Sequence, residues 1–169
     1  ERLENLGQRT LTGNDSHHPS DSWGDVMASK RDDFARICLL NLSGFSLSAQ
    51  SAKDDHLQSF MEENNVDVMI LPEANVCWHK LHHRDRLHKR TFGWFEDIHR
   101  GLAYNFGDDE SDRRQYGGVV ILSRNHSASR VMESGRDETG LGRWTWVRYR
   151  GRNGISTRMV GCYRPCVPS

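Results

Sequence analysis

The chain has 169 residues and a formal net charge of zero, from 23 basic and 23 acidic residues. This length is enough for one domain with a hydrophobic core of its own. No apolar run approaches the roughly 20 residues needed to cross a bilayer, and the N-terminal residues lack the pattern of a signal peptide, so the composition argues against a membrane-spanning protein and predicts a soluble one.

The two ends of the chain indicate a piece of a longer protein. The sequence begins at Glu1 without an initiator methionine, and residues 166–169 carry no helix or stop signal. Residues 1–33 mix Gly, Ser, Asn, Asp and His without a sustained hydrophobic period, which is typical of a linker or disordered arm. We therefore expect the folded region to occupy residues 34–169.

The first predicted elements form a strand, a helix and a second strand. Residues 35–42 are a continuous apolar run, as in a strand covered on both faces. Ser51 then caps a helix whose apolar residues recur at i, i+3 and i+4. These are Leu57, Phe60 and Met61. Residues 66–73 form a second apolar run, and this order predicts a right-handed crossover that joins parallel strands.

The rest of the chain is predicted to contain one more helix and several strands. Residues 76–89 favour a helix with a narrow apolar side and a basic remainder, and residues 107–114 a charged loop. Strands are expected at residues 96–104, 118–123, 129–133, 144–150 and 155–163. The last two, joined by the glycine-containing residues 151–154, are predicted to form a hairpin.

Four cysteines are present, Cys38, Cys77, Cys162 and Cys166. Two of them lie in apolar, strand-like runs, where a free thiol packs as a small hydrophobic group. We expect reduced thiols and an intracellular setting. The pair Cys162 and Cys166 has no second pair to complete a zinc site, so a structural metal is not favoured there.

Six arginines and no acidic residue fall between residues 139 and 169. The arginines are Arg143, Arg148, Arg150, Arg152, Arg158 and Arg164. Aromatic residues are interleaved with them, which is a pattern typical of a phosphate-facing surface. A solvated strand face whose acidic partners lie on neighbouring elements explains the same spacing equally well.

Both early strands end in a polar residue that a buried strand does not need, Asn41 on the first and Glu73 on the second. Parallel neighbours place their carboxyl ends at one edge of a sheet, where open α/β sheets bind ligands. A carboxylate there suits Mg²⁺, which one or two carboxylates hold together with waters and substrate phosphate. In the alternative, Asn41 caps a loop and Glu73 points to solvent.

Four motifs, in this order along the chain, resemble the endonuclease/exonuclease/phosphatase superfamily. They are Asn41-x-x-Gly44, Leu71-Pro72-Glu73, the run at residues 116–123, and Tyr163-Arg164-Pro165. The similarity covers residues 35–165, and residues 140–146 and 163–166 look most like the versions of this domain in eukaryotic mobile elements. It implies a DNase-like, four-layer α/β sandwich with a mixed sheet and two helices, of which this chain holds only the N-terminal portion.

The resemblance also implies roles for three residues. Glu73 matches the metal-binding glutamate, for Mg²⁺ or for Mn²⁺ in its place. Asn41 matches the asparagine that supports the metal and the scissile phosphate, and the hydroxyl of Tyr163 would donate a hydrogen bond to a phosphate oxygen. Arg143 and Arg164 are the arginines that we expect to contact phosphate.

The sequence departs from the family pattern in two places. Ser43 stands where many nucleases of this family carry an aspartate, and a serine hydroxyl cannot bind a cation as a carboxylate does. The later Asp-x-Asn strand end and the final Asp-His pair have no counterpart before the chain stops. Because the general base and the phosphate-polarising histidine are absent, we expect the fragment itself to be inactive.

The histidines offer a different site. His79 and His83 are four residues apart on the helix predicted at residues 76–89, with Cys77 and His88 nearby, which is a spacing that zinc can use. Basic neighbours would repel a cation, so a nucleic-acid-facing helix and a solvated helix face are the competing interpretations.

The sequence thus predicts part of a Mg²⁺-dependent phosphodiesterase, a DNA endonuclease, whose partners are DNA and the missing C-terminal half of its domain. The alternatives are a small-molecule or lipid phosphodiesterase or phosphatase of the same fold, and a catalytically inactive nucleic-acid-binding module. An incomplete sandwich would leave an apolar sheet face and unpaired strand edges, so we expect the isolated chain to aggregate.

Overall fold

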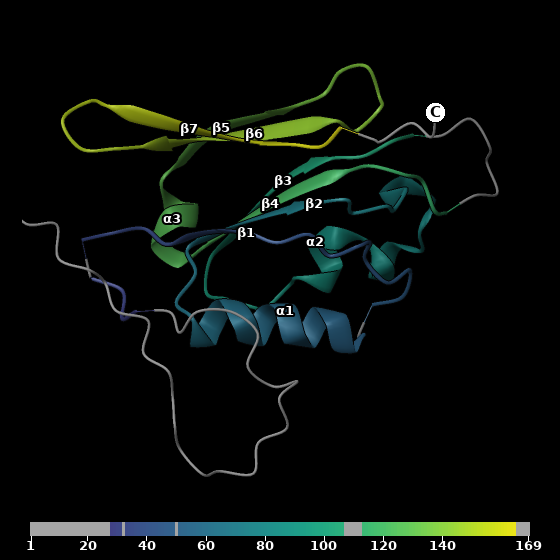
Figure 1. Cartoon of the computed structure of the whole chain (residues 1–169), viewed down its shortest axis with the longest axis horizontal. Helices are drawn as coiled ribbons and strands as arrows, with labels where there is room; N and C mark the ends of the chain where they lie inside the picture. Colours follow the sequence, from purple (N-terminus) through teal and green to yellow (C-terminus); the bar gives the residue numbers. More distant parts are fainter. Residues whose placement is uncertain (1–27, 32, 50, 107–112, 165–169) are drawn as a thin grey trace, which may run out of the picture.

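Three layers make up the computed structural model, which describes residues 28–31, 33–49, 51–106 and 113–164. Two β-sheets pack face to face, and helical segments cover the outer face of one of them (Figure 1). Most of the arm predicted at residues 1–33 and of the charged loop at 107–114 lies outside the described residues. The last part of the arm contacts the fold, since Lys30 Nζ lies 2.7 Å from an Asp67 carboxylate oxygen.

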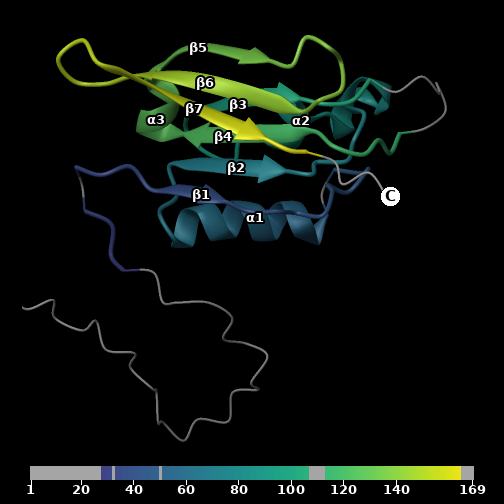
Figure 2. The ribbon, with the colours of Figure 1, turned by 45° about the horizontal axis from the view of Figure 1, so that its top comes forward.

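The first sheet is mixed and has the strand order β1-β2-β4-β3 (Figure 2). Its strands are β1 (Ile37–Leu39), β2 (Val68–Pro72), β3 (Ile98–Ala103) and β4 (Val119–Arg124). As predicted, β1 and β2 are parallel and are joined through helix α1 (Ala52–Glu63), whereas β4 is antiparallel to both of its neighbours. The mixed sheet confirms the α/β class.

Helix α1 begins as its sequence predicts. The hydroxyl of Ser51 accepts a hydrogen bond from the Asp54 N–H at 3.3 Å, which satisfies one free donor of the first turn. Leu57 and Met61 are buried on the inner face of the helix, and Phe60 is partly buried beside them. They pack against the side of the sheet that carries Met69, and this is the larger of the two cores.

Strand β4 is the centre of the fold. All six of its residues are buried, because alternate side chains face the helical layer and the second sheet. Val120 and Leu122 belong to the core under α1, and Ile121 packs toward Val147 of the second sheet. The strand predicted at residues 118–123 is therefore confirmed, and the structure shows that it is covered on both faces.

The second sheet is an antiparallel meander of β5 (Val131–Arg136), β6 (Trp144–Arg150) and β7 (Ser156–Cys162). The predicted β6–β7 hairpin is confirmed. Two glycines let the sheets approach closely: a Cβ at Gly101 would lie 2.9 Å from Val147 Cγ2, and one at Gly161 would lie 2.8 Å from Val119 Cγ1. The predicted strand at 129–133 starts later, since the short helix α3 (Asn125–Ser129) precedes it.

Strand β1 is not covered on both faces, contrary to the prediction for residues 35–42. Ile37 and Leu39 are 49% and 69% exposed. Their partners in the register are Val68 and Ile70, which face the second sheet. The second sheet ends at its edge strand β7, which contacts β2 and β4. The second sheet therefore does not extend over β1, and one face of β1 stays exposed.

The helix predicted at residues 76–89 is also wrong. The structure has three short pieces instead, η1 (Trp78–Lys80), η2 (His83–Asp85) and α2 (Leu87–Arg90). The backbone is extended at Leu81 and Arg86, between the pieces. The guanidinium of Arg86 donates to the His79 and Leu81 carbonyl oxygens, replacing bonds that a continuous helix would make internally.

The DNase-like sandwich is thus only partly matched. The described residues contain no helical layer over the outer face of β5–β6–β7, so three layers are seen where four were predicted (Figure 1). None of the helices in the described part of the chain is long and apolar enough to span a membrane.

Burial of His99, on β3, predicts a loss of stability at mildly acid pH. Burial and the nearby charge of Arg100 lower the pKa of His99 below its ordinary 6.5. Because this pKa is lower in the folded than in the unfolded chain, the stability it contributes is present above about pH 6.5 and is lost as the pH falls through the folded-state pKa. We expect urea titrations from about pH 7 to 5 to show a smaller loss in His99→Gln than in the parent. The same change at exposed His126 should leave the pH dependence unaltered.

Candidate functional site

The loops that follow β1 and β2 lie side by side at one edge of the first sheet. The Leu40 N–H donates to the Ile70 carbonyl at 3.0 Å, and the Phe45 N–H donates to the Ala74 carbonyl at 2.9 Å. Asn41 lies between the two donors and Glu73 between the two acceptors. The parallel pairing thus places both predicted residues at the carboxyl edge of the sheet.

Glu73 is partly buried and adopts a left-handed backbone conformation, with φ of 56°. That conformation costs a residue with a Cβ roughly 1–2 kcal/mol, so the surrounding structure must hold it. The next two residues fix the backbone at Glu73, since the Ala74 N–H donates to Gly118 O at 3.0 Å and the Asn75 N–H donates to Gly117 O at 2.7 Å. The Glu73 carboxylate itself forms no hydrogen bond or ion pair within the described residues.

Asn41 is exposed and caps its own loop. Its Oδ1 accepts a hydrogen bond from the Ser43 N–H at 2.8 Å, and Ser43 has φ of 49°. This is the loop cap that the alternative interpretation expected of Asn41. The bond leaves the amide Nδ2 as the group that can donate to a ligand.

Asn75 lies at the centre of this edge and was not predicted from the sequence. The Asn75 Oδ1 accepts a hydrogen bond from the Gly117 N–H at 2.9 Å. Gly44 also approaches closely, since a Cβ added to Gly44 would lie 3.4 Å from Asn75 Cβ and 2.9 Å from Arg114 Nη1. Asn75, Arg114, Gln115 and Tyr116 line a cavity of about 370 Å³. An asparagine three residues after the end of β2 was the available signal, since asparagine tolerates the φ of 52° found here.

Tyr163 reaches the same edge from the second sheet. A Cβ at Gly117 would lie 3.8 Å from Tyr163 Cδ1, which places the ring beside the Gly117 segment. The Tyr163 N–H donates to the Arg143 carbonyl at 2.8 Å, so Arg143 lies on the adjoining strand end. Arg164 is exposed, as the last described residue.

Glu133, on β5, neutralises part of the arginine surface. Glu133 Oε1 lies 3.0 Å from Arg148 Nη1 and 3.5 Å from Arg158 Nη2, and a hydrogen bond from Arg148 lowers the pKa of Glu133. Burial raises the pKa of Asp137, but hydrogen bonds from Thr139 and the Arg143 N–H outweigh it and leave that pKa low. Two of the six arginines therefore match the solvated-face interpretation.

The structure lacks the continuous helix on which the alternative zinc site depended. His79 lies in η1 and packs on Tyr104, with ring centres 5.7 Å apart, whereas His83 lies in η2 and packs on His88 at 5.3 Å. Cys77 Sγ is 3.4 Å from His79 Nδ1. Across the described ranges, no three His, Cys, Asp or Glu side chains are grouped so that they could hold a metal.

No model of a known protein family matches the chain, and no curated protein is significantly similar to it. The resemblance to the endonuclease/exonuclease/phosphatase superfamily therefore stays a hypothesis that rests on the ordered motifs.

Proposed function

We propose that this edge of the sheet is a Mg²⁺-dependent phosphodiester site of the DNA endonuclease type, with Glu73 as the metal ligand. The observation that carries the proposal is the hydrogen bond between Phe45 N and Ala74 O, which joins the loop of Asn41 to the loop of Glu73. Two sheets and four chain segments then contribute polar groups to one edge, as expected of a crevice at the carboxyl ends of parallel strands.

The residues present fit a hard cation and a phosphate. Glu73 offers a carboxylate that has no partner among the described residues, the type of ligand that Mg²⁺ accepts, and a bound cation would neutralise charge that develops on the phosphate oxygens. The Tyr163 hydroxyl and the Asn41 amide would donate hydrogen bonds to those oxygens. The Arg143 guanidinium would attract the polyanionic backbone toward the edge.

A single carboxylate holds Mg²⁺ weakly. Since Glu73 belongs to no group of three potential ligands in the described residues, we expect a dissociation constant on the order of 1 mM. The same residues offer no positioned general base beside Glu73, and the lack of one costs several orders of magnitude in rate. We therefore expect metal binding from this chain and at most slow cleavage.

Glu73→Gln tests the proposal without depending on turnover. Mn²⁺ binding, followed by the loss of the free-ion electron paramagnetic resonance signal, should show one weak site in the parent chain. The site should disappear in Glu73→Gln, because the amide cannot supply the negative charge, and should persist in Glu63→Gln, an exposed carboxylate at the end of α1. Equal Mn²⁺ binding by all three proteins would contradict the assignment.

Measurements of DNA affinity distinguish the proposed metal site from a catalytically inactive nucleic-acid-binding module. If the arginines alone bind DNA, affinity should fall steeply with salt and should not respond to Mg²⁺ or to Glu73→Gln. In the proposed site, Mg²⁺ should strengthen the binding of a short duplex to the parent and not to the variant. The neutralisation of Arg148 and Arg158 by Glu133 favours the second result.

A further inference from the structure

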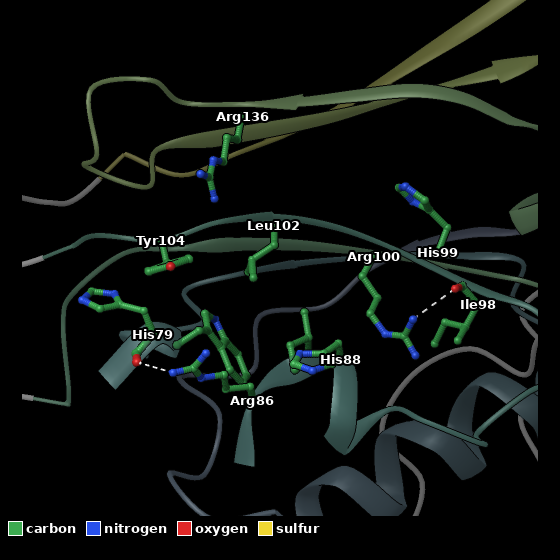
Figure 3. Close-up of a pocket in the computed structure, with 11 residues that line it drawn as sticks. His79, Arg86, His88, Ile98, His99, Arg100, Leu102, Tyr104 and Arg136 are labelled. Atoms are coloured by element: carbon green, nitrogen blue, oxygen red, sulfur yellow. Dashed lines mark hydrogen bonds between the residues drawn. The ribbon is translucent and has the colours of Figure 1, made fainter. Parts of the chain in front are cut away.

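A second cavity lies along β3, the outermost strand of the first sheet on the side away from β1 (Figure 3). It measures about 450 Å³, and its walls come from β3, from the 78–88 segment and from β5 of the second sheet. Six of its lining residues are basic or histidine side chains: His79, Arg86, His88, His99, Arg100 and Arg136. Among the described residues, the wall contains no acidic side chain.

The three arginines of the cavity carry charge that no carboxylate of the described residues neutralises. Arg86 donates to the backbone carbonyls of His79 and Leu81, and Arg100 to Thr91 and to the Ile98 carbonyl. None of the three has an acidic partner within 4.0 Å among the described residues. Their hydrogen bonds fix the first two guanidinium groups in place while leaving their charge available.

Arg136 supplies positive charge from the other sheet. Its side chain points from β5 toward the segment that holds Arg86 and His79 (Figure 3). It forms no hydrogen bond within the described part of the chain, and its guanidinium carbon lies 5.9 Å from the ring centre of Phe106. Like charges on two facing walls repel one another, so an anion between them would relieve the repulsion.

Two buried nitrogen atoms around the cavity lack hydrogen-bond partners among the described residues. Trp78, which is 2% exposed, has an indole N–H without an acceptor, and Nδ1 of His99 is also buried and unpartnered. Both residues line the cavity. A buried N–H without an acceptor loses its hydrogen bond to water on folding, and a ligand oxygen would remove that penalty.

One end of the cavity is aromatic. Tyr104 and His79 form its wall, with ring centres 5.7 Å apart, and Phe106 packs 5.0 Å from Tyr104. The hydroxyl of Tyr104 has no hydrogen-bond partner in the described residues. Ile98 and Leu102 add apolar surface, so the cavity suits more than a bare inorganic ion.

We propose that this cavity binds a nucleotide: a phosphate ester whose charge lies among Arg86, Arg100 and Arg136 and whose base packs against His79 and Tyr104. Guanidinium groups bind phosphate oxygens through paired hydrogen bonds, and a flat base stacks on aromatic rings. The cavity is large enough for a mononucleotide. The inference stands apart from the site at Glu73, since the residues that line this cavity come from β3, β5 and the 78–88 segment and include neither Asn41 nor Glu73.

The histidines fit the base end of such a ligand. Burial lowers the pKa of His79, of His88 and of His99, and the nearby charges that add to the effect all come from basic residues. At neutral pH each ring therefore keeps one donor and one acceptor nitrogen. Neutral imidazoles can hydrogen-bond both kinds of group at the edge of a base.

Calorimetric titration with AMP, adenosine and inorganic phosphate tests the proposal on the whole chain. AMP should bind at least about tenfold more tightly than adenosine or phosphate, because only AMP engages both ends of the cavity. Arg136→Gln should weaken AMP binding by roughly 10- to 100-fold, through the loss of a charge-assisted hydrogen bond. Arg130→Gln, a change at an exposed arginine outside the cavity wall, should leave AMP binding unchanged.

The variants also guard against a folding artefact. Arg136 is exposed and its side chain makes no hydrogen bond within the described residues, so Arg136→Gln should melt like the parent chain. A 5′-phosphorylated trinucleotide separates the two sources of nucleotide: affinity equal to that of AMP indicates a free nucleotide, and tighter binding indicates a strand end. Failure of AMP to bind at about 1 mM, or equal effects of the two arginine variants, would overturn the proposal.

Discussion

Arg90→Leu should lower the free energy of unfolding by roughly 3–5 kcal/mol, because it leaves the Asp54 carboxylate buried without a counter-charge. The two side chains are 0% and 4% exposed, and Arg90 Nε lies 3.2 Å from Asp54 Oδ2. Burial raises the pKa of Asp54 and lowers that of Arg90, as expected when both charges are removed from water. Urea titration followed by circular dichroism measures the loss.

The double variant Asp54→Leu/Arg90→Leu is the informative control. Neither carboxylate oxygen of Asp54 accepts a hydrogen bond of good geometry, so the pair compensates only part of its own desolvation. Arg90 also donates to Ser46 O at 2.9 Å, and that bond is lost in both variants. We expect the double variant to recover more than half of the stability lost in Arg90→Leu. A double variant less stable than Arg90→Leu would show that the ion pair is net stabilising.

Gly142→Ala is the second substitution with a large expected effect, a loss of at least about 4 kcal/mol, which is at the exceptional end for a single change. Gly142 has φ of 68°, and a Cβ there would lie 2.5 Å from Tyr104 Cα and 2.6 Å from Asn105 N, both backbone atoms that cannot rotate away. Its carbonyl also accepts a hydrogen bond from the Gly118 N–H at 3.1 Å. Thermal and urea unfolding measure the effect.

Gly154→Ala separates backbone strain from the steric clash. Gly154 has φ of 75°, and nothing lies within 4 Å of a Cβ built on it. The left-handed conformation alone should cost about 1–2 kcal/mol there. Similar losses in the two variants would mean that the Tyr104 backbone moves aside easily. A much larger loss at Gly142 would show that its close approach is rigid.

Local patterns predicted the elements that are defined by their own residues. Strand β4 was recognised because four consecutive apolar residues, Val119 to Leu122, form a run that favours a strand, and the β6–β7 hairpin because its turn contains glycine. The prediction that β1 is buried on both faces was wrong. Cover of its second face depends on how far the other sheet extends beyond β7, and residues 35–42 do not encode that extent. The helix predicted at residues 76–89 was wrong because its apolar residues do not line one continuous face of a helix and stabilise only single turns.

The candidate site shows the same division. Glu73 and Asn41 could be found because a polar residue at the end of an apolar run stands out in the sequence. Asn75 could not, since its position depends on Gly44 and Gly117, which approach it from distant parts of the chain. The arginines of the β3 cavity were also missed, because three separate segments bring them together and no single stretch carries the pattern.

The meander of the second sheet has a consequence for the speed of folding. Its three strands are joined in sequence order, so β5, β6 and β7 can pair through short loop closures. The first sheet needs β4 to insert between β2 and β3, strands that both precede it in the chain. Because such non-local pairing is slow, we expect this insertion to limit the folding rate. Until β4 is in place, its apolar residues are open to other chains, which makes this step the one most exposed to aggregation.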